Sequence, residues 1–244
     1  MRDAHAPLMS CRGFWCVCLL LFGIVAAGFG TPAMGAPAEC VDLPSSTFEA
    51  HHIWAAERTE RHDFGQALNE NFPDDFVAIR HPAMLVVNNV VGSFDVRHRM
   101  VSSGNGMICN APVFVKIALG TTQRIVVLSR FAAMDECVRS QLLDHEDAHA
   151  LAINRAVNDF IDAQTPMFQR GLQILKQTAS PSENIARDRW YAGLQMIVTA
   201  VRLELIERIR EAAVTVDDPL NLARLSAACD GKIGRIERED ITNP

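Results

Sequence analysis

The stretch His145-Glu146-Asp147-Ala148-His149 organises the interpretation of the whole sequence. Residues four apart lie about one turn apart on the same face of an α-helix, so the two imidazoles can converge on one metal ion. Glu146, one step round the helix, points toward the open position of such an ion. This spacing predicts a zinc site with His145 and His149 as ligands and Glu146 as the general base of a hydrolysis.

The residues around the motif predict a long central helix. Asp135 and Glu136 are typical of a helix start, so we expect the helix to run from near Asp135 to about Asp162. Apolar residues recur at three- and four-residue steps and share their stripe with both histidines, which therefore face the interior. These apolar residues are Val138, Leu142, Ala152, Ile153, Ala156 and Phe160.

On this motif the chain resembles the zincin metallopeptidases, and more loosely small secreted bacterial proteins described as zinc-dependent proteases. The resemblance covers Leu142 to about Ala156. It implies a peptide or protein substrate and one Zn²⁺. Asp147 departs from the pattern, since zincins usually carry uncharged residues between the Glu and the second His. An ordinary surface helix with two exposed histidines is the alternative interpretation.

The resemblance also assigns a role to the segment before the helix, because in zincins the strand beside the substrate precedes the active-site helix. Residues 124–130 are placed to be that strand. An extended peptide adds to the free edge of such a strand through main-chain hydrogen bonds. Packing of the same residues into the core is the alternative.

The N-terminus has the pattern of a signal peptide. An apolar run at 14–30 is followed by Ala36-Pro37-Ala38, a small-residue cleavage site before Glu39. A retained membrane anchor is the alternative. Cleavage leaves residues 39–244 as a single domain in the periplasm or secreted, without a membrane association.

The charge of the chain excludes one class of partner. The net charge is −6, and residues 1–38 hold Arg2, Arg12 and Asp3, a net of +1, so the mature chain carries −7. Nucleic acid is not expected as a partner of so acidic a protein. The sequence does not define the oligomeric state.

Four of the seven cysteines remain after cleavage: Cys40, Cys109, Cys137 and Cys229. An even number in an exported protein predicts disulfide bonds, with three possible connectivities. We expect Cys109 to bond Cys137 and Cys40 to bond Cys229.

The order of the elements predicts an α+β fold with a short mixed or antiparallel sheet. Ser46-Thr47-Phe48-Glu49 matches a capping box, which favours a helix to about residue 70. Strands are expected at 84–91, 94–101 and from 107 onward. The clearest element is a hairpin with strands 113–119 and 125–129 and a turn at 120–123, packed on the active-site helix.

The remainder of the chain, 163–244, is expected to be helical. Helices are predicted at 166–178, at 183–213 after a start at Ser180-Pro181-Ser182, and at 220–228.

A zinc ion held by two histidines needs a third protein ligand. Glu204 continues the apolar stripe of the long helix at 183–213, and this makes it the candidate ligand. An ion pair of Glu204 with Arg208 on a solvated face is the alternative. Glu207 and Glu183 are weaker candidates.

Among the other histidines, His98 lies in a predicted strand that can approach the site, whereas surface or core roles suit the rest: His51, His52, His62 and His81. Tyr191 is the only tyrosine and a candidate to stabilise the developing oxyanion, although ordinary burial is the preferred interpretation.

Three functions are consistent with these features. The first is an exported zinc metallopeptidase, a hydrolase. The second is a non-enzymatic exported binding or envelope protein with a degenerate motif. The third is a helical di-iron carboxylate protein, because Glu146-x-x-His149 has a second copy at Glu49-Ala50-His51-His52.

Overall fold

The computed structural model describes residues 40, 43, 46–55, 57–67, 69–102, 106–176 and 179–242, with the backbone alone at 174–176 and 237–242. The predicted signal peptide lies outside the described residues. The elements are β1 (Thr47–Ile53), β2 (Thr59–Arg61), α2 (Phe64–Ala67), β3 (Phe76–His81), β4 (Met84–Ser102), β5 (Ile108–Leu128), α3 (Arg130–Met134), α4 (Glu136–Lys176), β6 (Ala179–Ser180), α5 (Glu183–Val216) and α6 (Pro219–Thr242).

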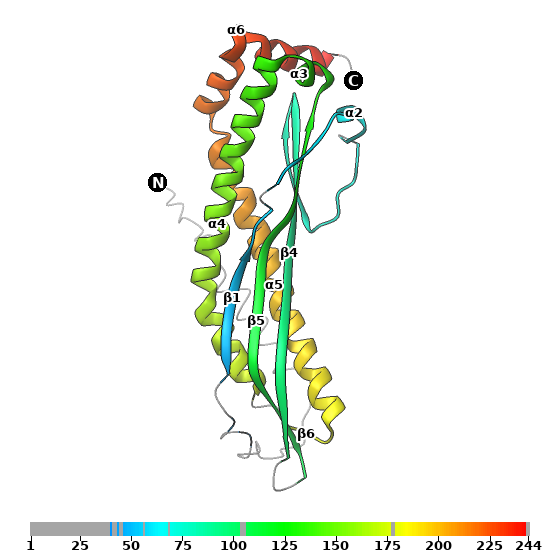
Figure 1. Cartoon of the computed structure of the whole chain (residues 1–244), viewed down its shortest axis with the longest axis vertical. Coiled ribbons are helices and arrows are strands. Elements are labelled where there is room, and N and C mark those ends of the chain that lie inside the picture. Colours follow the sequence, from blue (N-terminus) through cyan, green and yellow to red (C-terminus); the bar gives the residue numbers. More distant parts are fainter. Residues whose placement is uncertain are drawn as a thin grey trace, which may run out of the picture. The chain divides into compact units, whose positions relative to one another are not determined.

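The fold is α+β, as predicted, with a mixed six-stranded sheet and a C-terminal helical region. The order of the main path is β1-β5-β4-β3, and the short strands β2 and β6 also pair with β5. β1 and β2 run parallel to β5, whereas β4 and β6 run antiparallel to it. Helices α4 and α5 pack side by side on one face of the sheet and bury the main core there (Figure 1).

Helix α4, which carries His145 and His149, begins where the sequence predicts, because the Asp135 carboxylate accepts a hydrogen bond from the Val138 amide at 3.2 Å. It ends much later than predicted and fuses with the helix expected at 166–178. Pro166 lies inside α4. A proline has no amide hydrogen, so the carbonyl of Asp162, one turn earlier, has no hydrogen-bond donor within the helix. Asp162 is exposed, and water can donate to its carbonyl instead, so the helix continues through Pro166.

The predicted helix at 46–70 is wrong. β1 and β2 occupy most of this segment, and only Phe64–Ala67 is helical. Along β1 the exposure of the side chains alternates, with Phe48 and Ala50 turned toward the core. A period of two residues defines a strand, and here the pairing with β5 overrides the capping-box pattern.

The predicted turn at 120–123 is also wrong, since β5 is continuous through it and pairs with β4 as a long hairpin. Gly120 and Gly92 instead allow other segments of the chain to approach the sheet closely. A Cβ at Gly120, which has a φ of +148°, would lie 1.9 Å from the carbonyl oxygen of Ile53. A Cβ at Gly92 would lie 3.0 Å from Val198 of α5. Both glycines therefore mark places where other elements press on the sheet.

The strand segment before α4 has no free edge, contrary to the expectation of a substrate-binding edge. Residues 125–127 of β5 pair with β4 on one side and with β2 on the other. β2 is therefore the outer strand at this part of the sheet, and the bidentate hydrogen bond from Arg139 to Glu60, at 2.8 and 3.0 Å, ties it to α4.

Both predicted disulfide pairings are wrong, although all four cysteines are bonded. The bonds join Cys40 to Cys109 and Cys137 to Cys229. Cys109 lies at the start of the 21-residue strand β5, and Cys137 follows beyond its other end. At about 3.3 Å per residue the strand separates the two cysteines by roughly 60 Å, far more than a disulfide spans.

The two disulfides are consistent with an exported protein. None of the described helices combines the length and the apolar character needed to cross a bilayer.

Candidate metal centre

The two histidines of the motif lie side by side on α4 and face inward, as the apolar stripe predicts. The His149 side chain is 1% exposed and that of His145 is 9% exposed. Their Nε2 atoms are 3.2 Å apart, so both imidazoles are aimed at one point.

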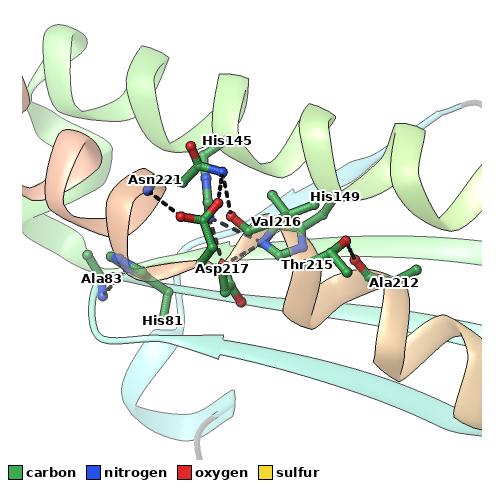
Figure 2. A network of polar contacts seen from close by, with 10 residues as sticks. His81, Ala83, His145, His149, Ala212, Thr215, Val216, Asp217 and Asn221 are labelled. Atoms are coloured by element: carbon green, nitrogen blue, oxygen red, sulfur yellow. Dashed lines mark hydrogen bonds and ion pairs between the residues drawn. The ribbon is translucent and has the colours of Figure 1, made fainter.

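A carboxylate that the sequence analysis did not select completes the cluster. Asp217 Oδ1 lies 3.0 Å from His145 Nε2 and 2.9 Å from His149 Nε2 (Figure 2). Within the described residues, these three side chains are the one group of histidines, cysteines and carboxylates arranged to hold a metal ion.

The chain around Asp217 is fixed by the junction of two helices. Asp217 is the C-cap of α5, and its amide donates to the carbonyl of Ala213 at 3.3 Å. Asp218 then caps α6 by accepting from the amide of Leu220 at 2.8 Å. Asn221 donates to the carbonyl of Val216 at 3.2 Å and so closes the junction (Figure 2). Asp217 is therefore presented by a rigid connection and not by a loose loop.

The donor atoms suit zinc in type and in spacing. Two imidazole nitrogens and one carboxylate oxygen form a usual zinc ligand set with a fourth position left open. Bond lengths of about 2.0 to 2.2 Å in a tetrahedron separate the donors by roughly 3.3 to 3.5 Å. The observed separations of 2.9, 3.0 and 3.2 Å need only a small expansion to accept the ion.

The ionisation of Asp217 also suits a metal ligand. Burial alone would raise the pKa of this carboxyl, but hydrogen bonds from His145 and His149 outweigh it and hold the pKa below its ordinary value. The carboxylate is therefore charged throughout the neutral range, as ligation requires.

The adjacent face of α4 carries a different cluster, made of two acids and two arginines. Glu146 lies 3.4 Å from the Nε atom of Arg124 and 3.7 Å from an Nη atom of Arg58. Asp147 lies 3.2 Å from Arg58 and 3.5 Å from Arg124. The charge at position 147, which departs from the zincin pattern, therefore serves to pair the arginines that flank Glu146.

Glu146 is the most deeply buried of these four charged groups, with a side chain 1% exposed. Burial raises its pKa to about 7, and the positive charge of Arg124 opposes this rise. Arg124 is itself held against the ring of Trp54, 5.9 Å from the ring centroid. A carboxyl group with a pKa near neutrality has the affinity for protons that a general base needs.

The structure does not bring Glu204 to the histidines. Glu204 pairs with Arg208 at 3.7 Å, which is the alternative that the sequence also supported. Its side chain is partly buried, and burial raises its pKa. Glu204 lies 13 residues before Asp217, and α5 contains this stretch up to Val216. Thirteen residues span about 20 Å along a helix.

The remaining candidates also lie away from the cluster. Glu207 pairs with Arg210, and Glu183 is exposed at the start of α5. His98 and Tyr191 contact each other, with ring centroids 5.9 Å apart, and Tyr191 also packs on Phe94. Tyr191 thus has the packing role that the sequence favoured for it.

The lengths of the two long helices contain a signal that excludes Glu204 as the third ligand. α4 and α5 form a helical hairpin, so residues at equal distances from the connection lie level. His145 precedes the end of α4 by 31 residues, and Asp217 follows the start of α5 by 34. Glu204 follows that start by only 21 residues. Glu211 follows the start of α5 by 28 residues and is as close to the level of His145 as Asp217 is, so the helix lengths exclude Glu204 without selecting Asp217.

The chain matches no protein-family model, no curated protein and no solved structure. The case for its function therefore depends on the geometry of the site.

Proposed function

We propose that this protein is an exported zinc-dependent peptidase whose ion is held by His145, His149 and Asp217. The convergence of these three side chains, with donor atoms 2.9 to 3.2 Å apart, is the observation that supports the proposal. Two of the ligands come from one turn of α4 and the third from the α5–α6 junction. This arrangement leaves one coordination position for a reactant, as in catalytic rather than structural zinc sites.

The proposed reaction is the hydrolysis of a peptide bond. A zinc ion held by His145, His149 and Asp217 would act as a Lewis acid, which would polarise the scissile carbonyl and lower the pKa of the attacking water. Glu146 accepts the proton of that water and returns it to the leaving amine. Arg124 and Arg58 hold the Glu146 carboxylate in place from the sheet and from the segment before β2.

The test uses purified protein with both disulfides intact. Wild-type protein is expected to contain one zinc per chain by elemental analysis and to cleave members of a peptide mixture followed by mass spectrometry. Glu146→Gln should keep the zinc and lose the cleavage, whereas His149→Ala should lose both. Cleavage by Glu146→Gln at the wild-type rate would contradict the assignment of the base.

The burial of Glu146 favours a second candidate, an exported metal-binding protein without hydrolytic activity. In that case the ion pairs between Glu146 and the arginines only stabilise the fold. Wild-type protein would then bind one zinc and cleave no peptide, and Glu146→Gln would change only the stability.

A di-iron centre has less support. The second motif copy, Glu49 to His52, lies in strand β1, where Glu49 is exposed and pairs with His51 at 3.0 Å. Successive residues of a strand point to opposite faces, so this copy lacks the helical spacing that a di-iron site uses. Two irons per chain would be the result that revives it.

A further inference from the structure

The two disulfide bonds of the protein lie in opposite environments. Cys40 and Cys109 are buried, with exposed fractions of 3% and 1%. Cys137 is exposed and Cys229 is partly exposed, so their bond lies at the surface. A thiolate reduces a disulfide by attacking one of its sulfur atoms, and it must first reach that atom. The Cys137–Cys229 bond is therefore far more accessible to a dissolved thiol than the buried bond.

The backbone at Cys229 has a conformation that most residues avoid. Helix α6 is interrupted at Ala228. The next three residues all have positive φ: +54° at Cys229, +59° at Asp230 and +71° at Gly231. In the described part of the chain, the first two are the residues other than glycine with a positive φ. A Cβ makes this left-handed region costly, so the turn needs other contacts to hold it.

The disulfide is the strongest of the contacts that hold this turn. It joins Cys229 to the first turn of α4. An ion pair of Lys232 with Asp135 at 2.7 Å also joins α6 to the start of α4. Arg235 donates to the carbonyl of Asp230 within the turn at 3.0 Å. The lysine and the arginine are exposed, and polar contacts of exposed side chains stabilise only weakly.

The two segments that the disulfide joins also meet at the candidate metal centre. His145 lies eight residues after Cys137 on α4, about 12 Å along a helix, and Asp217 lies twelve residues before Cys229. Helix α4 thus supplies the histidines, and the junction that begins α6 supplies the carboxylate. The disulfide limits how far α6 can move from α4. A ligand side chain that is less well ordered before binding lowers the affinity, because binding must then order it.

We propose that the Cys137–Cys229 bond is a redox switch, which a dithiol opens and which regulates the metal centre. The effect on the metal rests on the proposed zinc binding. When the bond opens, the left-handed turn relaxes and Asp217 is held less firmly against the histidines. Ile233 is fully buried and keeps the second half of α6 on the core, so the protein with the open bond stays folded.

The chemical step is a thiol–disulfide exchange. One thiolate of the dithiol attacks the exposed sulfur of Cys137, which gives a mixed disulfide and releases Cys229 as a thiolate. The second thiolate of the dithiol then displaces Cys137, and the dithiol leaves as its own disulfide. The protein gains two electrons, and the two protons of the dithiol end on the two cysteines.

The first measurement is the order in which the two disulfides open. Folded protein is incubated with dithiothreitol, and samples are alkylated over time and mapped by mass spectrometry. The Cys137–Cys229 bond should open roughly 100-fold faster than the Cys40–Cys109 bond, because the buried sulfurs become accessible only after local unfolding. Equal rates for the two bonds would overturn the proposal.

The second measurement tests the left-handed turn. Asp230→Ala and Asp230→Gly are a matched pair, because both remove the same exposed carboxylate. Alanine has a Cβ in the left-handed region, and this cost exceeds the extra freedom that glycine gains when the turn relaxes. In mixtures of reduced and oxidised dithiothreitol, the equilibrium constant for reduction should be about fivefold larger for Asp230→Ala than for Asp230→Gly. Equal constants would show that the bond does not hold the turn, which overturns the proposal.

The third measurement is the zinc affinity, from competition with a zinc-sensitive dye. Free thiols themselves bind zinc. The open state is therefore represented by the double variant Cys137→Ser/Cys229→Ser and, independently, by wild type whose two thiols are blocked with iodoacetamide. Both should bind zinc about tenfold more weakly than the oxidised protein. Wild type that is reduced and then reoxidised before alkylation is the control and should regain the full affinity.

The outcomes separate this inference from the proposed function. Oxidised wild type that binds no zinc overturns the proposed function, and the opening rates and the Asp230 pair then decide whether the switch exists. Equal zinc affinity of the oxidised and open forms overturns the regulation while the metal centre stands. Loss of the helical circular dichroism signal on selective opening also overturns the proposal, because the bond would then be needed for folding.

Discussion

Two neighbouring faces of helix α4 carry charged residues with opposite arrangements. One face presents His145 and His149 to Asp217, with three donor atoms converging on one point. The next face presents Glu146 and Asp147 to Arg58 and Arg124, with each charge compensated by an opposite one. The first set brings three ligand atoms to one point, whereas in the second set each acid faces an arginine. Burial of charged groups alone therefore does not make a metal site, and the ligand atoms must also converge.

The largest effect that this comparison predicts is the loss of the metal. His145→Ala or His149→Ala removes one of three ligands, so zinc content should fall from one per chain to nearly none after dialysis against buffer. His98→Ala is the control, since His98 lies against Tyr191 and should keep the full zinc content. Full zinc retention in both ligand variants would contradict the site. Elemental analysis is the measurement.

The next effect separates Asp217 from Glu204. Asp217→Asn replaces a charged ligand by a neutral one and should weaken zinc binding by about 100-fold or more. Glu204→Gln should leave the affinity within about twofold, because Glu204 pairs with Arg208. Competition against a zinc-sensitive dye measures both. The reverse ranking would return the third ligand to Glu204.

A smaller effect concerns Glu146 in the metal-free protein. Burial raises its pKa to about 7 in the folded state, against an ordinary value of 4.5. As pH rises between these two values, the unfolded chain loses this proton before the folded protein does, so wild-type stability should fall. Glu146→Gln removes this penalty. Its advantage over wild type should be near zero at pH 4 and on the order of 3 kcal/mol at pH 8.

Urea unfolding of both metal-free proteins at the two pH values measures this difference. An advantage that is the same at pH 4 and pH 8 would show that Glu146 does not titrate between the folded and unfolded states as described.

The smallest effect belongs to Asp147, whose side chain is 56% exposed. Exposed ion pairs contribute about 0 to 1 kcal/mol. Asp147→Asn should therefore lower the stability by less than about 1 kcal/mol and leave the zinc content unchanged. Thermal unfolding and elemental analysis test this. A loss of zinc would show that Asp147 affects the metal site, and it would contradict the independence of the two faces of α4.

The sequence predicted the parts of the site that depend on local periodicity. A helix repeats every 3.6 residues, so the convergence of His145 and His149 and their inward orientation follow from the pattern alone. The start of α4 at Asp135 and the start of α5 after Ser182 follow from capping chemistry, and the structure confirms both.

The parts that failed depend on contacts between distant segments. The apolar stripe of α5 indicates which side of the helix faces inward, but it does not indicate the position along the helix axis. For this reason it pointed to Glu204. The capping box at Ser46 did not form a helix because β1 found a pairing partner in β5. The cysteine pairing depends on which ends of the sheet the cysteines occupy, and local sequence does not contain this information.

His145, His149 and Asp217 are proposed to hold one metal ion. Crystals grown with zinc, with diffraction recorded on both sides of the zinc absorption edge, test it most directly. We expect one anomalous peak per chain, within about 2.2 Å of His145 Nε2, His149 Nε2 and an Asp217 carboxylate oxygen. A peak beside Glu204, or none near the two histidines, would contradict it.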